Sequence, residues 1–157
     1  MKRTSLLFAF CILIPFSCDF GDHPLTDPNE IYEKADALIQ ERSFKQAKPL
    51  LEEAVGLFKK IKNNDRLTQS LISLVQTEME LGEFKTALAV SEEAATLMRM
   101  EGDVHGEIRM AFYFGTLYTK IQMFDRAAAW YRKALASATA FGDKKAFSEA
   151  RLKLAFT

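Results

Sequence analysis

Apolar and small residues recur at steps of three, four and seven along most of the chain, a spacing that places side chains on one face of an α-helix. The clearest case is the segment 104–138, where the pattern predicts two helices joined by a tight turn. Gly115 and Ala127 would let these two helices approach closely, with aromatic side chains filling the space beside them. No segment shows the period-two alternation of a strand, so we expect an all-α fold.

The pattern recurs upstream at a constant interval of about 40 residues, which we call the repeat step. Phe44 and Phe84, for example, lie one repeat step apart. Four sets of positions share this step: Phe44, Phe84 and Phe124; Ala47, Ala87 and Ala127; Ala54, Ala94 and Ala134; and Asn63, Asp103 and Asp143. Four sets in one register indicate internal repeats. The alternative is an Ala-rich helical bundle without true repeats.

The spacing in the segment 104–138 resembles the tetratricopeptide (TPR) repeat, a helix-turn-helix with small and aromatic residues at fixed places. The matching core positions are Gly115, Tyr118, Phe124, Ala127, Tyr131 and Ala134. Ala111 stands where the family usually has Trp, the closing Pro is absent, and the repeat step is longer than the family's usual period. The resemblance implies a right-handed α-solenoid of antiparallel helix pairs over residues 27–157, with about three repeats plus a C-terminal helix.

Helix boundaries follow from capping and turn residues. Asp27 is a cap candidate, with Glu30 as its capping-box partner, so the first helix is expected to run to about residue 42. A partner helix is expected from Phe44 to about residue 62, with Pro49 causing a kink or a late start. Gly82 suits a turn, and the Gly-Asp pairs at 102–103 and 142–143 would end one helix and cap the next.

The N-terminal sequence is typical of a secretion signal. Lys2 and Arg3 precede an apolar run of residues 6–16, too short to span a bilayer as a helix. The run ends in Ser17-Cys18, which resembles a bacterial lipoprotein lipobox, although Pro15 replaces the usual Leu. We therefore expect a signal peptide at 1–17, then a lipidated Cys18 and a flexible tether over 18–26, with a membrane anchor made of acyl chains. Ordinary secretion, an uncleaved anchor and a buried N-terminal helix are the alternatives.

Charge and side-chain chemistry argue against several classes of function. The 21 basic and 21 acidic residues balance, so no basic surface for nucleic acid is indicated. Both cysteines, Cys11 and Cys18, lie in the N-terminal leader region, and neither histidine has a neighbour at a metal-ligand spacing. No phosphate-binding glycine-rich loop occurs, so we expect no enzyme, no metal and no cofactor.

The TPR resemblance places a partner-binding groove on the first helices of successive repeats. Carried over position by position, it gives Tyr32, Asp36, Gln69, Gln76, Arg109, Phe112, Tyr113, Thr116 and Lys120 as groove residues. Rigid aromatic area beside hydrogen-bonding groups suits an extended peptide or a helix. The alternative is that this face is merely solvated. The expected function is that of an envelope-associated adaptor that binds a protein or peptide.

The C-terminal helix allows two interpretations. It is either a solubilising cap or an apolar edge, formed by Phe147, Leu152 and Phe156, that docks on a second copy of the chain or on another protein. Two other functions stay open beside the adaptor. One is a solute-binding accessory of a transporter, and the other is a structural protein that self-associates through this edge.

Overall fold

The computed structural model describes residues 27–157, and every regular element in this range is a helix. The seven helices are α1 (Pro28–Gln40), α2 (Phe44–Ile61), α3 (Asn64–Leu81), α4 (Phe84–Glu101), α5 (Val104–Lys120), α6 (Phe124–Phe141) and α7 (Lys144–Ala155). The all-α prediction is confirmed for these residues. The predicted signal peptide, Cys18 and tether lie outside the described range.

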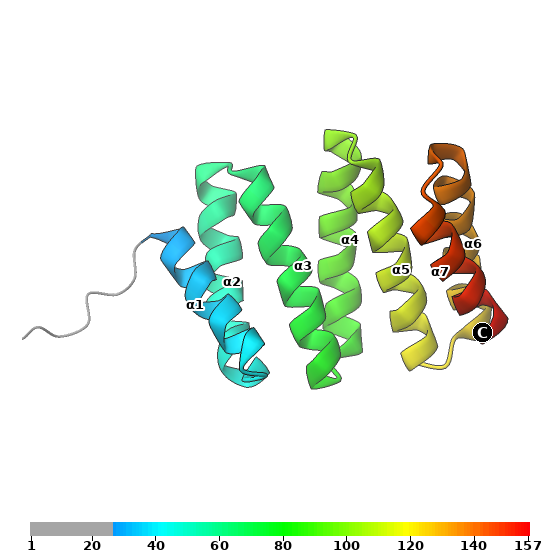
Figure 1. The fold of residues 1–157 in the computed structure, drawn as a ribbon. Coiled ribbons are helices and arrows are strands. Elements are labelled where there is room, and N and C mark those ends of the chain that lie inside the picture. Colours follow the sequence, from blue (N-terminus) through cyan, green and yellow to red (C-terminus); the bar gives the residue numbers. More distant parts are fainter. Residues whose placement is uncertain (1–26) are drawn as a thin grey trace, which may run out of the picture.

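The helices form a row in which each one packs on the next, and α1 also contacts α3. Short turns reverse the chain between successive helices, so neighbours are antiparallel (Figure 1). Figure 1 also shows α2 and α6 lying behind α1 and α7, so that odd-numbered and even-numbered helices form two layers. This arrangement of consecutive helix pairs is consistent with an α-solenoid.

The turns between the second helix of one repeat and the first helix of the next follow the predicted chemistry. Gly102 and Gly142 have φ values of 70° and 72°, a left-handed conformation that glycine adopts without steric cost. Asp103 and Asp143 each accept a hydrogen bond from the backbone N–H three residues on, at 2.9 Å. The first such turn has Lys62 instead of glycine, at φ 56°.

The first two helices differ in detail from expectation. Asp27 caps α1 as predicted, but its side chain accepts from the backbone N–H and the side-chain amide of Asn29, at 2.9 and 3.0 Å, and no bond to Glu30 is seen. The prediction that α2 starts late is wrong, because α2 begins at Phe44 and continues through Pro49. Pro49 is exposed, and its ring deprives the carbonyl of Lys45 of a helical amide partner.

The alanines that share the repeat step form the core between the layers. All six are fully buried: Ala47, Ala54, Ala87, Ala94, Ala127 and Ala134. The phenylalanine set behaves differently, since Phe124 is 48% exposed and Phe44 and Phe84 are half-buried. The prediction of Phe124 as a core residue is therefore wrong. Each of these phenylalanines is the first residue of an even-numbered helix, at the end of the layer where little packs over it.

Candidate functional site

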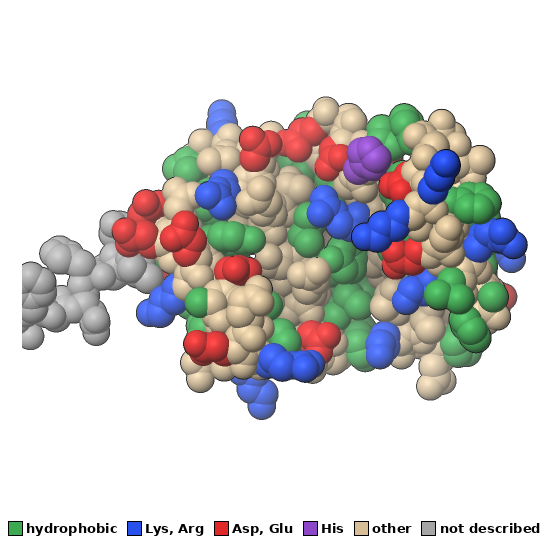
Figure 2. All heavy atoms as spheres, in the orientation of Figure 1, with side chains coloured by type: hydrophobic (Ala, Val, Ile, Leu, Met, Phe, Trp, Pro, Cys, Tyr) green, Lys and Arg blue, Asp and Glu red, His purple; other side chains and the backbone are tan. Residues whose placement is uncertain are grey.

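The nine predicted groove residues all lie on odd-numbered helices, and none of them is buried. Half-buried members are Tyr32 and Asp36 on α1 with Phe112, Tyr113 and Thr116 on α5, and exposed members are Gln69 and Gln76 on α3 with Arg109 and Lys120 on α5. One layer of the molecule therefore presents them all. This layer faces the reader in Figure 2.

A pocket of about 560 Å³ lies on this layer between α5 and α7. Four predicted residues line it, namely Arg109, Phe112, Tyr113 and Thr116. Met79 of α3 closes one side, and α7 supplies charged side chains on the other, with Lys145, Glu149 and Lys153 among them. The pocket thus combines an aromatic wall from α5 with a charged wall from α7. We call it the α5–α7 pocket.

The aromatic wall of the α5–α7 pocket is held from behind by α6. Tyr131 is 2% exposed, and its hydroxyl lies 3.3 Å from Oγ1 of Thr116, within hydrogen-bond distance. The rings of Phe112 and Tyr131 are tilted at 48° with centroids 6.3 Å apart, a favourable aromatic geometry. The backbone of α5 reaches Tyr131 because Gly115 carries no side chain. Phe112 and Thr116 are therefore positioned by the repeat core.

Tyr113 links the pocket to the preceding repeat. Nε2 of Gln76 on α3 donates a hydrogen bond to Oη of Tyr113 at 2.5 Å, so two predicted groove residues from neighbouring repeats are in direct contact. Burial raises the pKa of the Tyr113 phenol above its usual value of 10, while the Gln76 donor and the positive charge of Arg109 oppose this shift. The phenol therefore stays protonated at neutral pH and can donate a hydrogen bond to a bound group.

The basic groups of the pocket are available to a ligand. Within residues 27–157, Arg109, Lys145 and Lys153 form no ion pair closer than 4 Å, and neither does Glu149. The remaining acid, Asp143, lies 3.6 Å from the imidazole of His105. Three lysine and arginine side chains thus face two carboxylates, which favours an anionic group on the ligand.

Sequence reasoning missed Lys145 and Lys153. Both lie one repeat step after residues on the groove side of α5, since Lys145 corresponds to His105 and Lys153 to Tyr113. The repeat register was therefore the signal that would have found them. Glu149 on the same helix also lines the pocket.

The other predicted residues lie outside the α5–α7 pocket. Tyr32 contacts α3 instead: its hydroxyl is 3.2 Å from Oγ of Ser73, and the guanidinium carbon of Arg66 lies 5.9 Å from its ring centroid. Asp36, Gln69 and Lys120 share the odd-numbered layer but do not line the pocket. Tyr32 thus bridges α1 and α3 in the N-terminal part of the predicted groove.

Charge changes sign along the odd-numbered layer. Helix α1 with its cap Asp27 carries four acidic residues and one lysine, whereas α7 carries four basic residues and one glutamate. Figure 2 shows acidic side chains gathered at the α1 end and basic side chains at the α7 end. A segment lying along this layer would therefore meet negative electrostatic potential at the α1 end and positive potential at the α7 end.

Among residues 27–157, no group of three or more His, Cys, Asp or Glu side chains is placed to hold a metal ion. In the same range, no helix combines the length and the apolarity needed to cross a membrane.

Comparison with known proteins adds no assignment. No protein-family model matches the chain, and no curated protein matches it either.

Proposed function

We propose that the protein is an adaptor of the TPR kind, a right-handed solenoid that binds a protein or peptide partner on its odd-numbered layer and works at a bacterial membrane. The single observation that carries the proposal is the α5–α7 pocket, where unpaired basic groups stand beside a fixed aromatic wall. Rigid aromatic side chains and Arg are the residues that most often dominate binding energy at protein interfaces.

The charge gradient suggests the polarity of the bound segment. Arg109, Lys145 and Lys153 favour an acidic stretch in the α5–α7 pocket, and the acidic side chains of α1 favour a basic or neutral stretch beyond it. The hydroxyl of Tyr113 and the side chain of Thr116 offer hydrogen bonds to the backbone of an extended segment. A peptide that runs across α5 toward α1 uses all of these groups.

Two features favour a peptide over the rival functions. Arg109, Lys145 and Glu149 are exposed at the pocket, so it resembles part of an open groove more than the enclosed cavity that a small solute requires. The face of α7 that corresponds to the buried, α6-facing side of α5 is suited to contact with solvent. It carries Ser148, Arg151 and Ala155 at the positions where α5 has the buried Ile108, Ala111 and Gly115.

This comparison of α7 with α5 supports the cap interpretation of the last helix. An eighth helix or a second copy packed as α6 packs on α5 would have to bury the guanidinium of Arg151, which lies 5.8 Å from the ring centroid of Phe147. Leu152 and Phe156 stay 58% and 81% exposed. We therefore favour an adaptor over self-association through this edge.

The membrane part of the proposal rests on the N-terminal sequence. Cleavage after residue 17 and acylation of Cys18 would place the helical domain close to a membrane surface, on a tether that ends at Thr26. More than one acyl chain is needed for stable anchoring. The adaptor would then present its odd-numbered layer to partners in the bacterial envelope.

The test uses the full-length protein, purified in detergent, as bait for detergent extract of the native envelope. The groove variant carries Arg109→Glu and Lys153→Glu. The matched control carries Lys45→Glu and Lys60→Glu, which make the same charge change at exposed positions of α2. A partner held by the parent and the control but lost from the groove variant supports the proposal. A partner held equally by all three proteins contradicts it.

A further inference from the structure

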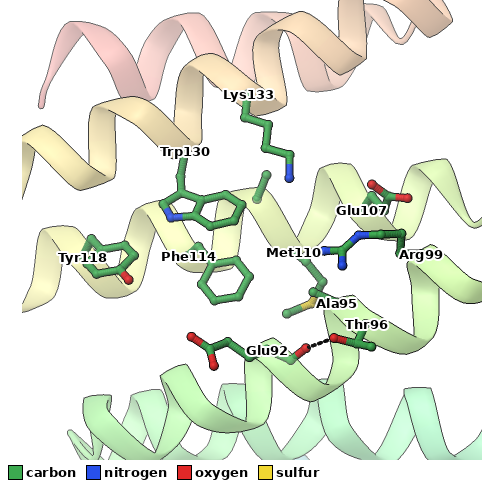
Figure 3. A pocket seen from close by; sticks show the side chains of 11 residues that line it. Glu92, Ala95, Thr96, Arg99, Glu107, Met110, Phe114, Tyr118, Trp130 and Lys133 are labelled. Carbon is green, nitrogen blue, oxygen red and sulfur yellow. Dashed lines mark hydrogen bonds between the residues drawn. The ribbon is translucent and has the colours of Figure 1, made fainter.

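A second pocket, of about 290 Å³, opens between the even-numbered helices α4 and α6, with α5 as its floor. Figure 3 shows Trp130 and Phe114 in its centre. Their rings are stacked at 20° with centroids 4.4 Å apart, and Met110 extends the apolar floor. None of the predicted groove residues lines this pocket. We call it the α4–α6 pocket.

The residues that line the α4–α6 pocket, at the junction between α4 and α6, differ from those at the corresponding positions one repeat earlier. At the first junction Val55 and Leu71 pack in the core, and one repeat step later Ala95 and Ala111 occupy the same places. Leu67, which is buried, corresponds to the half-buried Glu107. Smaller or more polar side chains thus replace aliphatic groups at these positions, whereas Leu74 and Val90 are replaced by the larger Phe114 and Trp130.

The charges at the two junctions differ in the same way. At the first junction Nζ of Lys59 on α2 lies 2.5 Å from Oε1 of Glu93 on α4, an ion pair that ties the two helices together. The corresponding residues at the second junction are Arg99 and Lys133, both basic. These two cannot attract each other, and within residues 27–157 neither forms an ion pair closer than 4 Å. The second junction therefore leaves its cations free.

The α4–α6 pocket has opposite charges toward its two ends. Figure 3 shows Glu92 toward one end, while Arg99 and Lys133 lie toward the other with Glu107 beside Arg99. The step from Glu92 to Arg99 on α4 corresponds to about 10 Å along a helix. Nζ of Lys133 also lies 4.8 Å from the ring centroid of Trp130. The apolar centre is thus flanked by a carboxylate on one side and by two cations on the other.

We propose that the α4–α6 pocket is a second docking site, and that it takes a segment of a partner protein in which an apolar side chain lies between a basic and an acidic residue. The apolar side chain contacts Trp130 and Phe114, the basic residue pairs with Glu92, and the acidic residue pairs with Arg99 and Lys133. The backbone positions of Glu92 and Arg99, about 10 Å apart along α4, correspond to a base and an acid roughly three residues apart in an extended segment or seven apart in a helix. The ammonium and carboxylate of a free amino acid are too close together to reach both ends.

The two pockets lie on different sides of α5. Arg109 and Tyr113 face the α5–α7 pocket, whereas the adjacent residues Met110 and Phe114 face the α4–α6 pocket. Helix α5 therefore borders two binding surfaces that share no lining residue, and a protein with both can hold two partners at once. This inference does not depend on the α5–α7 pocket being occupied.

The test begins with a displayed library of random peptides about a dozen residues long, selected on the full-length protein in detergent. Enriched sequences are synthesised with a fluorescent label and titrated by anisotropy. Trp130 is the only tryptophan of the chain, so its intrinsic emission reports on this pocket in the parent protein. We expect enriched peptides with an apolar residue between a base and an acid, and a change in Trp130 emission on binding.

Two variants and one control decide the outcome. Trp130→Ala removes the central apolar contact. Lys133→Glu places an acid opposite Arg99, as Glu93 lies opposite Lys59 at the first junction. Each should weaken the enriched peptides by about tenfold or more, whereas Lys85→Glu, an exposed change elsewhere on α4, should not. Peptides with base and acid exchanged should also bind about tenfold more weakly. The proposal is overturned if no such peptides are enriched, or if they bind Lys133→Glu as tightly as the parent.

Discussion

The ring of Tyr131 occupies the space that a side chain at Gly115 would need. A Cβ atom built on Gly115 would lie 2.6 Å from Cδ1 of Tyr131, closer than such atoms approach in proteins. Helices α5 and α6 can meet this closely only because position 115 is glycine. The same Tyr131 supports Phe112 and Thr116 in the α5–α7 pocket, so this contact connects the repeat core to the proposed binding surface.

Gly115→Ala should therefore destabilise the protein. The added methyl group forces the Tyr131 ring or the α5 backbone to move, and overpacking of this kind typically costs about 1–3 kcal/mol. Urea unfolding measured by circular dichroism gives the change in free energy. The matched control is Gly56→Ala in α2, where a Cβ atom would meet nothing within 4 Å and where better helix propensity should add up to about 1 kcal/mol. Equal effects of the two substitutions would contradict the packing argument.

The ion pair between Lys59 and Glu93 should stabilise the first junction modestly. Their side chains are 58% and 39% exposed, so solvent screens the pair and we expect about 0.2–1 kcal/mol. Glu93→Lys creates the two like charges that the second junction has, and should lower the free energy of unfolding by a similar amount. Adding Lys59→Glu restores opposite charges and should recover most of the loss. If the two substitutions are additive in urea unfolding, the helices are not coupled through this pair.

Glu78 should make stability depend on pH. It is 2% exposed, its Oε2 atom has no hydrogen-bond partner in the described residues, and Lys48 lies 3.4 Å from its Oε1 atom. Burial raises the pKa of this carboxyl above its ordinary value of 4.5, and Lys48 opposes the shift. The folded state then binds a proton more tightly than the unfolded state. The stability that proton binding by Glu78 contributes is fully present below the pKa that this carboxyl has in the unfolded chain. It is lost as pH rises through the higher pKa that the carboxyl has in the folded protein.

The measurement for Glu78 is urea unfolding of the parent and Glu78→Gln from about pH 7.5 down to the ordinary carboxyl pKa of 4.5. As pH falls, the parent should gain stability relative to Glu78→Gln, which cannot titrate at this position. Glu52→Gln serves as the control, because it removes an exposed carboxylate 3.7 Å from the same Lys48 without touching the buried one. The account is wrong if the parent instead loses stability relative to Glu78→Gln on acidification.

Much of the fold follows from short-range rules that are visible in the sequence. Gly102, Asp103, Gly142 and Asp143 mark helix ends because left-handed backbone and side-chain caps each need particular residues. The buried alanines were predictable for a similar reason, since close helix contacts require small side chains. Phe124 was predicted less well because a shared register does not fix how much neighbouring structure covers a position.

The binding surfaces were predicted only in part. Arg109, Phe112, Tyr113 and Thr116 meet in one pocket as the repeat register suggested, but Lys153 was missed although it follows Tyr113 by one repeat. The α4–α6 pocket escaped notice because it arises from differences between repeats and not from their common pattern. Ala95, Phe114 and Trp130, for example, line one pocket only once α4, α5 and α6 are placed together.

The measurement that tests the central claim most directly is site-specific photo-cross-linking in the cells that make the protein. The photoreactive amino acid p-benzoylphenylalanine replaces Glu149 in the α5–α7 pocket or, as a matched control, Glu53 on α2. Both glutamates are exposed and helical. The adaptor account predicts a discrete adduct from position 149 that disappears when Arg109→Glu is added, and no such adduct from position 53. Absence of an adduct at position 149, or an adduct that Arg109→Glu does not weaken, would contradict it.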